Sequence, residues 1–136
     1  MAHYAFIDDN NVVISVITGV DEDSPLPDGY TSWEQFYGEL KGYTCKRTSY
    51  NTIKKEHVKG GTPFRGNYAG IGDTYDVEND RFIGEQEYPS FVWNESEYEW
   101  QPPVARPETD PDKYEWNEEA YQADNTQGWV LTPENR

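Results

Sequence analysis

The 136-residue sequence contains one cysteine, one methionine, two histidines and three leucines. With a single cysteine, Cys45, no internal disulfide can form, and nothing points to an oxidising compartment. The two histidines, His3 and His57, form no Cys/His cluster for zinc. A Cys45–His57 thiol pair is conceivable, but no catalytic motif surrounds either residue. We therefore expect a protein that is not an enzyme and that needs no cofactor or metal.

Long apolar runs are also missing. The first thirteen residues lack the basic and apolar regions of a signal peptide, and no apolar run approaches the length of a membrane span. We expect a soluble protein that is made in a cytoplasm and does not bind membranes.

Aromatic residues take the place of the scarce aliphatic ones. They make up 15% of the chain, while all hydrophobic residues together reach only 35%. Nine prolines and eleven glycines divide the sequence into short pieces. This composition favours short strands and turns over a helical bundle, and the length predicts one domain.

The net charge of -15 is unevenly distributed. Residues 1–40 carry eight acids and no Lys or Arg, and residues 66–136 carry seventeen acids and four bases. Such an acidic body argues against nucleic-acid binding. Residues 41–65 carry seven bases and one acid, which indicates either a solvated loop or an interface with an acidic surface. The interface candidates in this basic segment are Lys46, Arg47, Lys54, Lys55, Lys59 and Arg65.

The first half of the chain predicts a hairpin, a helix and a strand. Residues 3–17 favour a β-hairpin with its loop at 8–11, which would place Ile7 opposite Val12. Residues 43–50 favour a strand.

Residues 32–40 have the spacing of a short amphipathic helix, with Ser32 as the N-cap and Gly42 as the stop signal. The expected core face of this helix consists of Trp33, Phe36, Tyr37 and Leu40.

A loose repeat fills the second half. The segments "YDVENDRF", "FVWNESEY" and "YEWNEEAY" each place an aromatic residue on either side of a polar stretch. Each predicts a hairpin with a four-residue loop, at 78–81, 94–97 and 117–120. The expected cross-strand pairs are Val77–Phe82, Trp93–Tyr98, Phe91–Trp100 and Trp116–Tyr121.

Together these patterns predict a mainly β protein of linked hairpins with one short α-helix, in an arrangement that could be elongated. Residues 1–73 would hold the N-terminal hairpin, helix and basic loop, and residues 74–136 the Pro-linked aromatic hairpins, as one structural unit. A lone hairpin is marginally stable, so the aromatic faces must be covered by this chain or by a partner. The aromatic interface candidates are Phe91, Trp93, Tyr98, Trp100, Tyr114, Trp116, Tyr121 and Trp129.

Five stretches of the sequence, in order, are "MAHYAFIDDNNVVISVI", "CKRTSYNT", "FRGNYAGIGDTYDVENDRFI", "YPSFVWNESEYEWQPPVARP" and "KYEWNEEAY". Through these stretches, the chain as a whole resembles a family of small proteins encoded by marine tailed bacteriophages, cyanophages among them. The family usually has Tyr at the position of Asp73, and it usually ends soon after a Trp, whereas this chain continues beyond Tyr121.

The resemblance implies a structural protein of the virion, made in the cytoplasm of a bacterial host, and it assigns no catalytic residue. A capsid decoration or cement protein and a component of the tail or neck both fit this description. The partners would be the major capsid protein, tail proteins or further copies of this chain.

Two alternatives remain open. The segment "YEWNEEAYQADNTQGWVLTP" resembles short pieces of small chitin-binding modules, although the Gly-Asp-x-Val strand of those modules is missing. This likeness indicates a carbohydrate-binding accessory domain on the virion surface. The other alternative is a chaperone for fibre assembly, which would be absent from mature particles.

Overall fold

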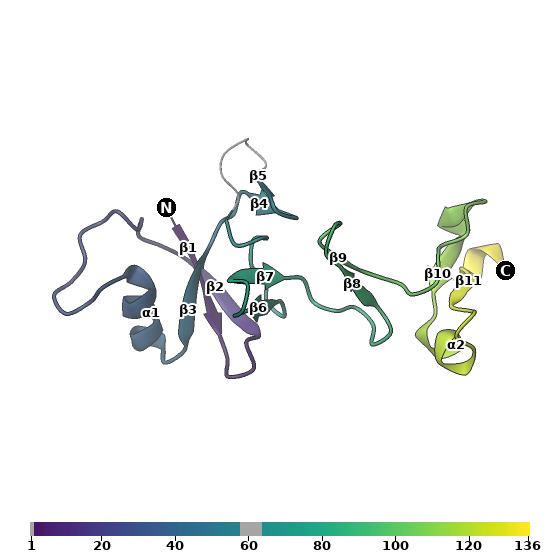
Figure 1. Ribbon diagram of the computed structural model, residues 1–136, viewed down its shortest axis with the longest axis horizontal. Helices are drawn as coiled ribbons and strands as arrows, with labels where there is room; N and C mark the ends of the chain where they lie inside the picture. Colours follow the sequence, from purple (N-terminus) through teal and green to yellow (C-terminus); the bar gives the residue numbers. More distant parts are fainter. Residues whose placement is uncertain (1, 58–63) are drawn as a thin grey trace. The chain divides into compact units, whose positions relative to one another are not determined.

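The computed structural model describes residues 2–57 and 64–136 (Figure 1). Strand residues (31%) outnumber helical ones (16%), which confirms the prediction of a mainly β protein. The chain forms two compact units: unit 1 comprises Met1–Glu85 and Glu97–Glu99, and unit 2 comprises Gln86–Ser96 and Trp100–Arg136. The sequence predicted that the second region begins at residue 74, with the hairpin whose loop was expected at 78–81. That hairpin belongs to unit 1, and the chain first passes to unit 2 after Glu85. In the described ranges, no helix combines the length and the apolar character that crossing a membrane requires.

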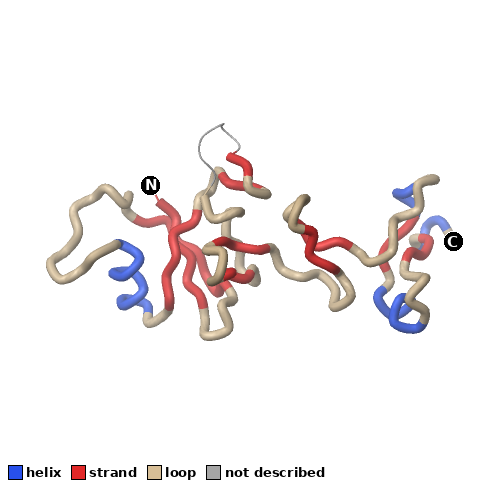
Figure 2. The backbone as a smooth tube through the Cα atoms, in the orientation of Figure 1, coloured by secondary structure: helices blue, strands red, loops and turns tan. Residues whose placement is uncertain are grey.

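Unit 1 is built on a three-stranded antiparallel sheet with the order β2-β1-β3, formed by β1 (Ala2–Ile7), β2 (Val13–Gly19) and β3 (Thr44–Thr48) (Figure 2). The last four side chains of the central strand β1 are at most 1% exposed. Because successive side chains of a strand point to opposite faces, both faces of this sheet must be covered.

One face of the sheet carries Tyr4 and Phe6, and helix α1 (Trp33–Lys41) covers it. Trp33 and Tyr37 of the helix pack against these two side chains, and the Tyr4 and Tyr37 ring centroids lie 4.8 Å apart. Leu40 remains 64% exposed, so only part of the predicted helical stripe meets the sheet.

The ends of α1 follow the predicted capping pattern. The Ser32 hydroxyl accepts a hydrogen bond from the Gln35 amide (3.0 Å), and Gly42 ends the helix with a left-handed φ of 79°. The Gln35 side chain accepts from the Thr31 amide (2.8 Å), so it reaches one residue further back than in a standard capping box.

The other face of the sheet carries Ala5, Ile7 and Val13, and the hairpin of β6 (Thr74–Asp76) and β7 (Arg81–Ile83) covers it. Tyr75 and Phe82 supply the aromatic rings of this layer, with centroids 5.3 Å apart. The connection between β3 and β6 contains the short strands β4 (Thr52–Ile53) and β5 (Glu56–His57), which pair with each other.

The registers of the first two predicted hairpins are wrong by one or two residues. Ile7 pairs with Val13 instead of Val12, since the loop holds five residues, 8–12, and Val12 forms a bridge with Thr74. A bulge between Phe6 and Ile7 shifts the rest of the ladder by one further residue. Phe82 pairs with Tyr75 instead of Val77, so the loop is 77–80.

The turn chemistry explains the position of the 77–80 loop. The Asp76 carboxylate accepts hydrogen bonds from both the backbone amide and the side chain of Asn79, and Asp80 adopts a left-handed φ of 49°. Asp76 therefore initiates the turn, and Val77 lies within it and is 62% exposed.

Unit 2 contains β8 (Val92–Asn94), part of β9 (Glu99–Gln101), β10 (Tyr114–Trp116), α2 (Glu118–Ala123) and β11 (Trp129–Leu131). Two short 3-10 helices, Pro111–Lys113 and Pro133–Asn135, complete it. Strand β8 pairs with β9, and β10 pairs with β11.

The predicted third hairpin does not exist: residues 117–120 begin helix α2, and β10 pairs with β11 from the C-terminal tail. The Asn117 side chain accepts a hydrogen bond from the Ala120 amide (2.8 Å), and Glu118 and Glu119 occupy the first turn. A capping Asn followed by two acids and good helix formers favours a helix over a tight turn. Trp116 therefore lies opposite Trp129, not opposite Tyr121.

Candidate functional site

Unit 2 has a pocket of about 370 Å³ with mainly aromatic walls. A volume of this size falls within the range of small-molecule sites. The walls consist of Tyr88, Phe91, Pro102, Tyr114, Trp116 and Trp129, and the charged side chains Glu87, Arg106 and Glu115 also line the pocket.

Trp116 lies at the centre of the aromatic cluster. Its ring meets Phe91 (5.5 Å between centroids) and Trp129 (5.4 Å) nearly edge to face, and Tyr121 at a tilt (5.6 Å). Gly128 lies directly against the indole, since a Cβ on this glycine would come within 2.4 Å of the ring. These contacts hold the Trp116 ring in place at the centre of the cluster.

Local structure in unit 2 positions these rings. Antiparallel pairing of β10 and β11 places Trp116 beside Trp129. Helix α2, which begins after Asn117, returns Tyr121 to the Trp116 ring. The Trp129 indole N–H donates to the carbonyl oxygen of Val104 (2.8 Å), which attaches the Pro-rich connection to β11.

Charged groups lie at the rim of the pocket. The Arg106 guanidinium lies over the Trp129 ring, 5.0 Å from its centroid, and donates to the carbonyl oxygens of Pro111 (2.9 Å) and Tyr114 (3.0 Å). Glu115 forms an exposed ion pair with Arg136 (3.7 Å).

Glu118 lies next to this cluster and is held in its charged form. The Ser90 hydroxyl, the Gln122 amide and the Trp116 indole N–H all donate to its carboxylate. These hydrogen bonds, that from Ser90 above all, lower the pKa of Glu118 below its usual value. Glu118 thereby links Ser90 to the start of α2.

The aromatic residues proposed as interface candidates do not form a single face. The Trp93 and Trp100 rings contact each other, with centroids 5.5 Å apart, and replace the predicted Trp93–Tyr98 and Phe91–Trp100 pairs. Phe91 instead packs between Tyr88 (5.0 Å) and Trp116.

Tyr98 belongs to unit 1 and is only 2% exposed. It ends the loop between β8 and β9 with a left-handed φ of 53°, and its hydroxyl donates to the carbonyl oxygen of Phe82 (2.5 Å). The predicted loop, 94–97, lies one residue too early, and that error placed Tyr98 on the wrong surface.

Much of the charge in the basic segment is neutralised within the chain. Arg65 forms an ion pair with Glu34 of α1 (2.6 Å) and donates a hydrogen bond to the carbonyl oxygen of Arg47 in β3 (2.8 Å). It therefore connects the helix to β3. Arg47 lies 2.6 Å from Glu22. Two acidic residues of the segment 1–40, Glu34 and Glu22, therefore supply partners for Arg65 and Arg47.

The lysines of the same segment also make contacts inside unit 1. Lys54 forms an ion pair with Glu99 (2.6 Å), Lys55 lies over the Tyr98 ring and Lys46 lies over the Tyr75 ring. Lys59 lies outside the described residues.

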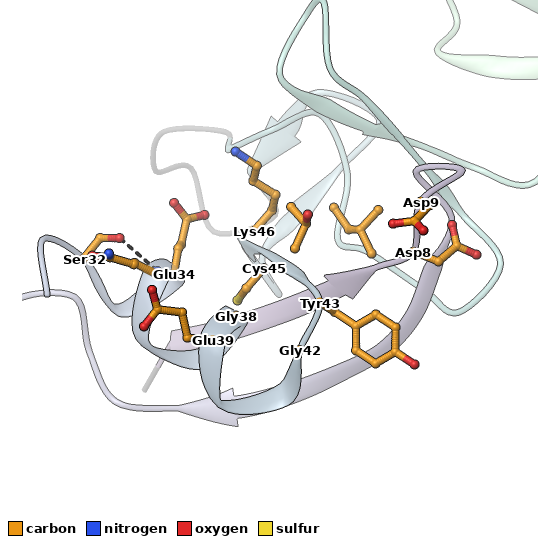
Figure 3. Close-up of a pocket in the computed structure, with 13 residues that line it drawn as sticks. Asp8, Asp9, Ser32, Glu34, Gly38, Glu39, Gly42, Tyr43, Cys45 and Lys46 are labelled. Atoms are coloured by element: carbon orange, nitrogen blue, oxygen red, sulfur yellow. Dashed lines mark hydrogen bonds between the residues drawn. The ribbon is translucent and has the colours of Figure 1, made fainter.

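Unit 1 has an open depression of about 710 Å³ between α1 and the end of the sheet (Figure 3). Acidic side chains from the helix, Glu34 and Glu39, and from the β1–β2 loop, Asp8 and Asp9, border it. No group of three or more His, Cys, Asp or Glu side chains in the described part of the chain is arranged to hold a metal ion.

Cys45 lies at the base of this depression and is 6% exposed. Burial, reinforced by the nearby Glu34 carboxylate, raises the pKa of its thiol to about 12. Its burial makes Cys45 a core residue. Because the thiolate is the reactive form of cysteine, the raised pKa also makes Cys45 a poor nucleophile.

Comparisons with known proteins give no relative: no protein-family model, curated protein or solved structure matches the chain.

Proposed function

We propose that this chain is a non-enzymatic structural protein of a tailed-bacteriophage virion, either a capsid decoration or cement protein or a component of the tail or neck. The observation that carries this proposal is the division of a short chain into two compact units, each organised around its own aromatic side chains. Two linked units can bind two neighbouring surfaces, and linkage makes the second contact far more favourable than it is alone. Proteins that reinforce boundaries between capsid subunits need this property.

The environments of Cys45 and His3 also fit a structural role. The Cys45 thiol is buried and protonated, as described above. The His3 ring stacks on Tyr50 (5.8 Å between centroids) and meets Tyr68 edge to face (5.5 Å), as in a packed surface cluster. These side chains contribute to packing, which suits a structural protein.

A decoration protein stabilises a particle by mass action, because it binds the assembled state and not the dissociated one. The test uses particles from a phage in which the gene is deleted, mixed with the purified full chain. We expect saturable co-sedimentation and a higher temperature of genome release. An unrelated protein of similar size and net charge provides the control.

A tail or neck component would instead be required for assembly of infectious particles. Intact, infectious deletion particles that neither bind nor respond to the added chain would contradict the proposal.

A further inference from the structure

We propose that the aromatic pocket of unit 2 binds a neutral saccharide. This goes beyond the structural role proposed above and does not depend on it. The pocket offers what a sugar ring requires: aromatic surface for its apolar C–H face and polar groups at the rim for its hydroxyls.

The charges of the pocket favour a neutral ligand. Of the three charged side chains that line the pocket, Glu115 is paired with Arg136, which leaves the Glu87 carboxylate and the Arg106 guanidinium. The nearby Glu118 carboxylate is already occupied by its three donors. A cationic ligand would meet Arg106, and an anionic ligand would meet Glu87. Neither charge sign gains a clear electrostatic advantage.

The hydrogen-bonding groups favour a ligand that donates. The Trp116 and Trp129 indole N–H groups already serve Glu118 (3.1 Å) and Val104 (2.8 Å) inside the protein. Grooves that read proline-rich peptides use aromatic side chains and must satisfy peptide carbonyls, which need donors. Arg106 also lines the pocket, and two of its N–H groups already donate to the carbonyl oxygens of Pro111 (2.9 Å) and Tyr114 (3.0 Å). The exposed carboxylates of Glu87 and Glu115 offer acceptors. Sugar hydroxyls supply the donors that carboxylates need.

The experiment uses the full chain and two-dimensional NMR of its indole N–H signals. The probes are methyl glycosides of glucose, galactose, mannose and N-acetylglucosamine, together with their linear tetrasaccharides. We expect at least one probe to shift the Trp116 and Trp129 signals saturably. The signal of Trp33, in unit 1, should stay unchanged.

Glu87→Gln and Glu108→Gln form a matched pair of variants. Both side chains are exposed in unit 2, but only Glu87 lines the pocket. Glu87→Gln should weaken the binding about tenfold, since a hydrogen bond to a charged acceptor becomes one to a neutral acceptor, while Glu108→Gln should leave it unchanged. Equal affinity of the two variants would overturn the proposal.

Two further results would also overturn it. One is the absence of any saturable shift of the pocket signals with all the saccharides. The other is a shift of these signals only with a proline-rich or a lysine-rich peptide, which would assign the pocket to a protein partner.

Discussion

Gly66 and Tyr98 show how single residues fix the packing of unit 1. A Cβ on Gly66 would lie 1.9 Å from the Tyr98 hydroxyl, and Gly66 has a φ of 78°. The Tyr98 hydroxyl cannot move away without losing its hydrogen bond to the Phe82 carbonyl. The absence of a side chain at Gly66 is therefore a condition for burying Tyr98.

Gly66→Ala should lower the free energy of unfolding by about 2 kcal/mol or more, because it combines a steric clash with an unfavourable backbone conformation. Urea denaturation measures the change. Gly84→Ala is the control: no atom lies within 4 Å of its added Cβ, so we expect a change of a few tenths of a kcal/mol. Similar losses in both variants would refute this account of Tyr98.

The Cys45 thiol should react slowly in the folded protein. Its burial and its raised pKa of about 12 leave almost no thiolate at pH 8. Reaction with a disulfide reagent should be slow in buffer and at least about a hundredfold faster in denaturant, where the pKa returns to near 8.5. Equal rates in the two conditions would show that the thiol is accessible in the native state.

At the scale of elements, the sequence predicts the regular pieces and misses those decided by turn chemistry. Helix α1 has an apolar stripe and caps at both ends, and it forms as predicted. The segment after Trp116 looks like the hairpin segment after Trp93, since both read Trp-Asn-Glu. Their outcomes differ because good helix formers follow Asn117, and pairing with the distant β11 is not visible in a local pattern.

The pocket of unit 2 could be predicted only in part. Phe91, Trp116 and Trp129 were recognised as candidates, but the partner assigned to Phe91 was wrong, and Tyr121 reaches Trp116 from helix α2 and not across a hairpin. Tyr88 and Arg106 were missed, because each joins the pocket through contacts between segments that are separate in the sequence. A cation above an aromatic ring has no spacing signature.

Asn117→Ala tests whether the cap determines the fate of this segment. Loss of a side-chain N-cap costs about 1 kcal/mol, so the variant should be less stable by that amount. Asn125→Ala, at an exposed loop position of the same unit, should be close to neutral. Thermal unfolding followed by tryptophan fluorescence compares the two. If Asn117→Ala matches the Asn125→Ala control, α2 does not depend on its cap.

At the scale of the whole molecule, the two units differ in how deeply they bury their side chains. The central strand β1 of unit 1 is buried on both faces, whereas Phe91, at 9% exposed, is the one buried large apolar side chain in the part of unit 2 that the structure describes. Backbone amides exchange fastest where few apolar contacts oppose local opening. Unit 2 should therefore be the less protected of the two.

Hydrogen exchange measured by mass spectrometry tests this difference. Peptides that cover β1 should exchange slowest, and peptides that cover β10 and β11 should exchange at least about tenfold faster, since 1.4 kcal/mol of opening free energy is a factor of ten. Matching protection in both units would mean that they open together as one cooperative structure.

The proposed virion role is tested most directly by quantitative mass spectrometry of gradient-purified particles of a tailed phage whose genome carries the gene. A structural protein should be found in mature particles at a fixed ratio to the major capsid protein, high for capsid decoration and low for a tail or neck component. It should remain after repeated banding. Absence of the chain from mature particles, with abundant chain in the infected lysate, would contradict the account.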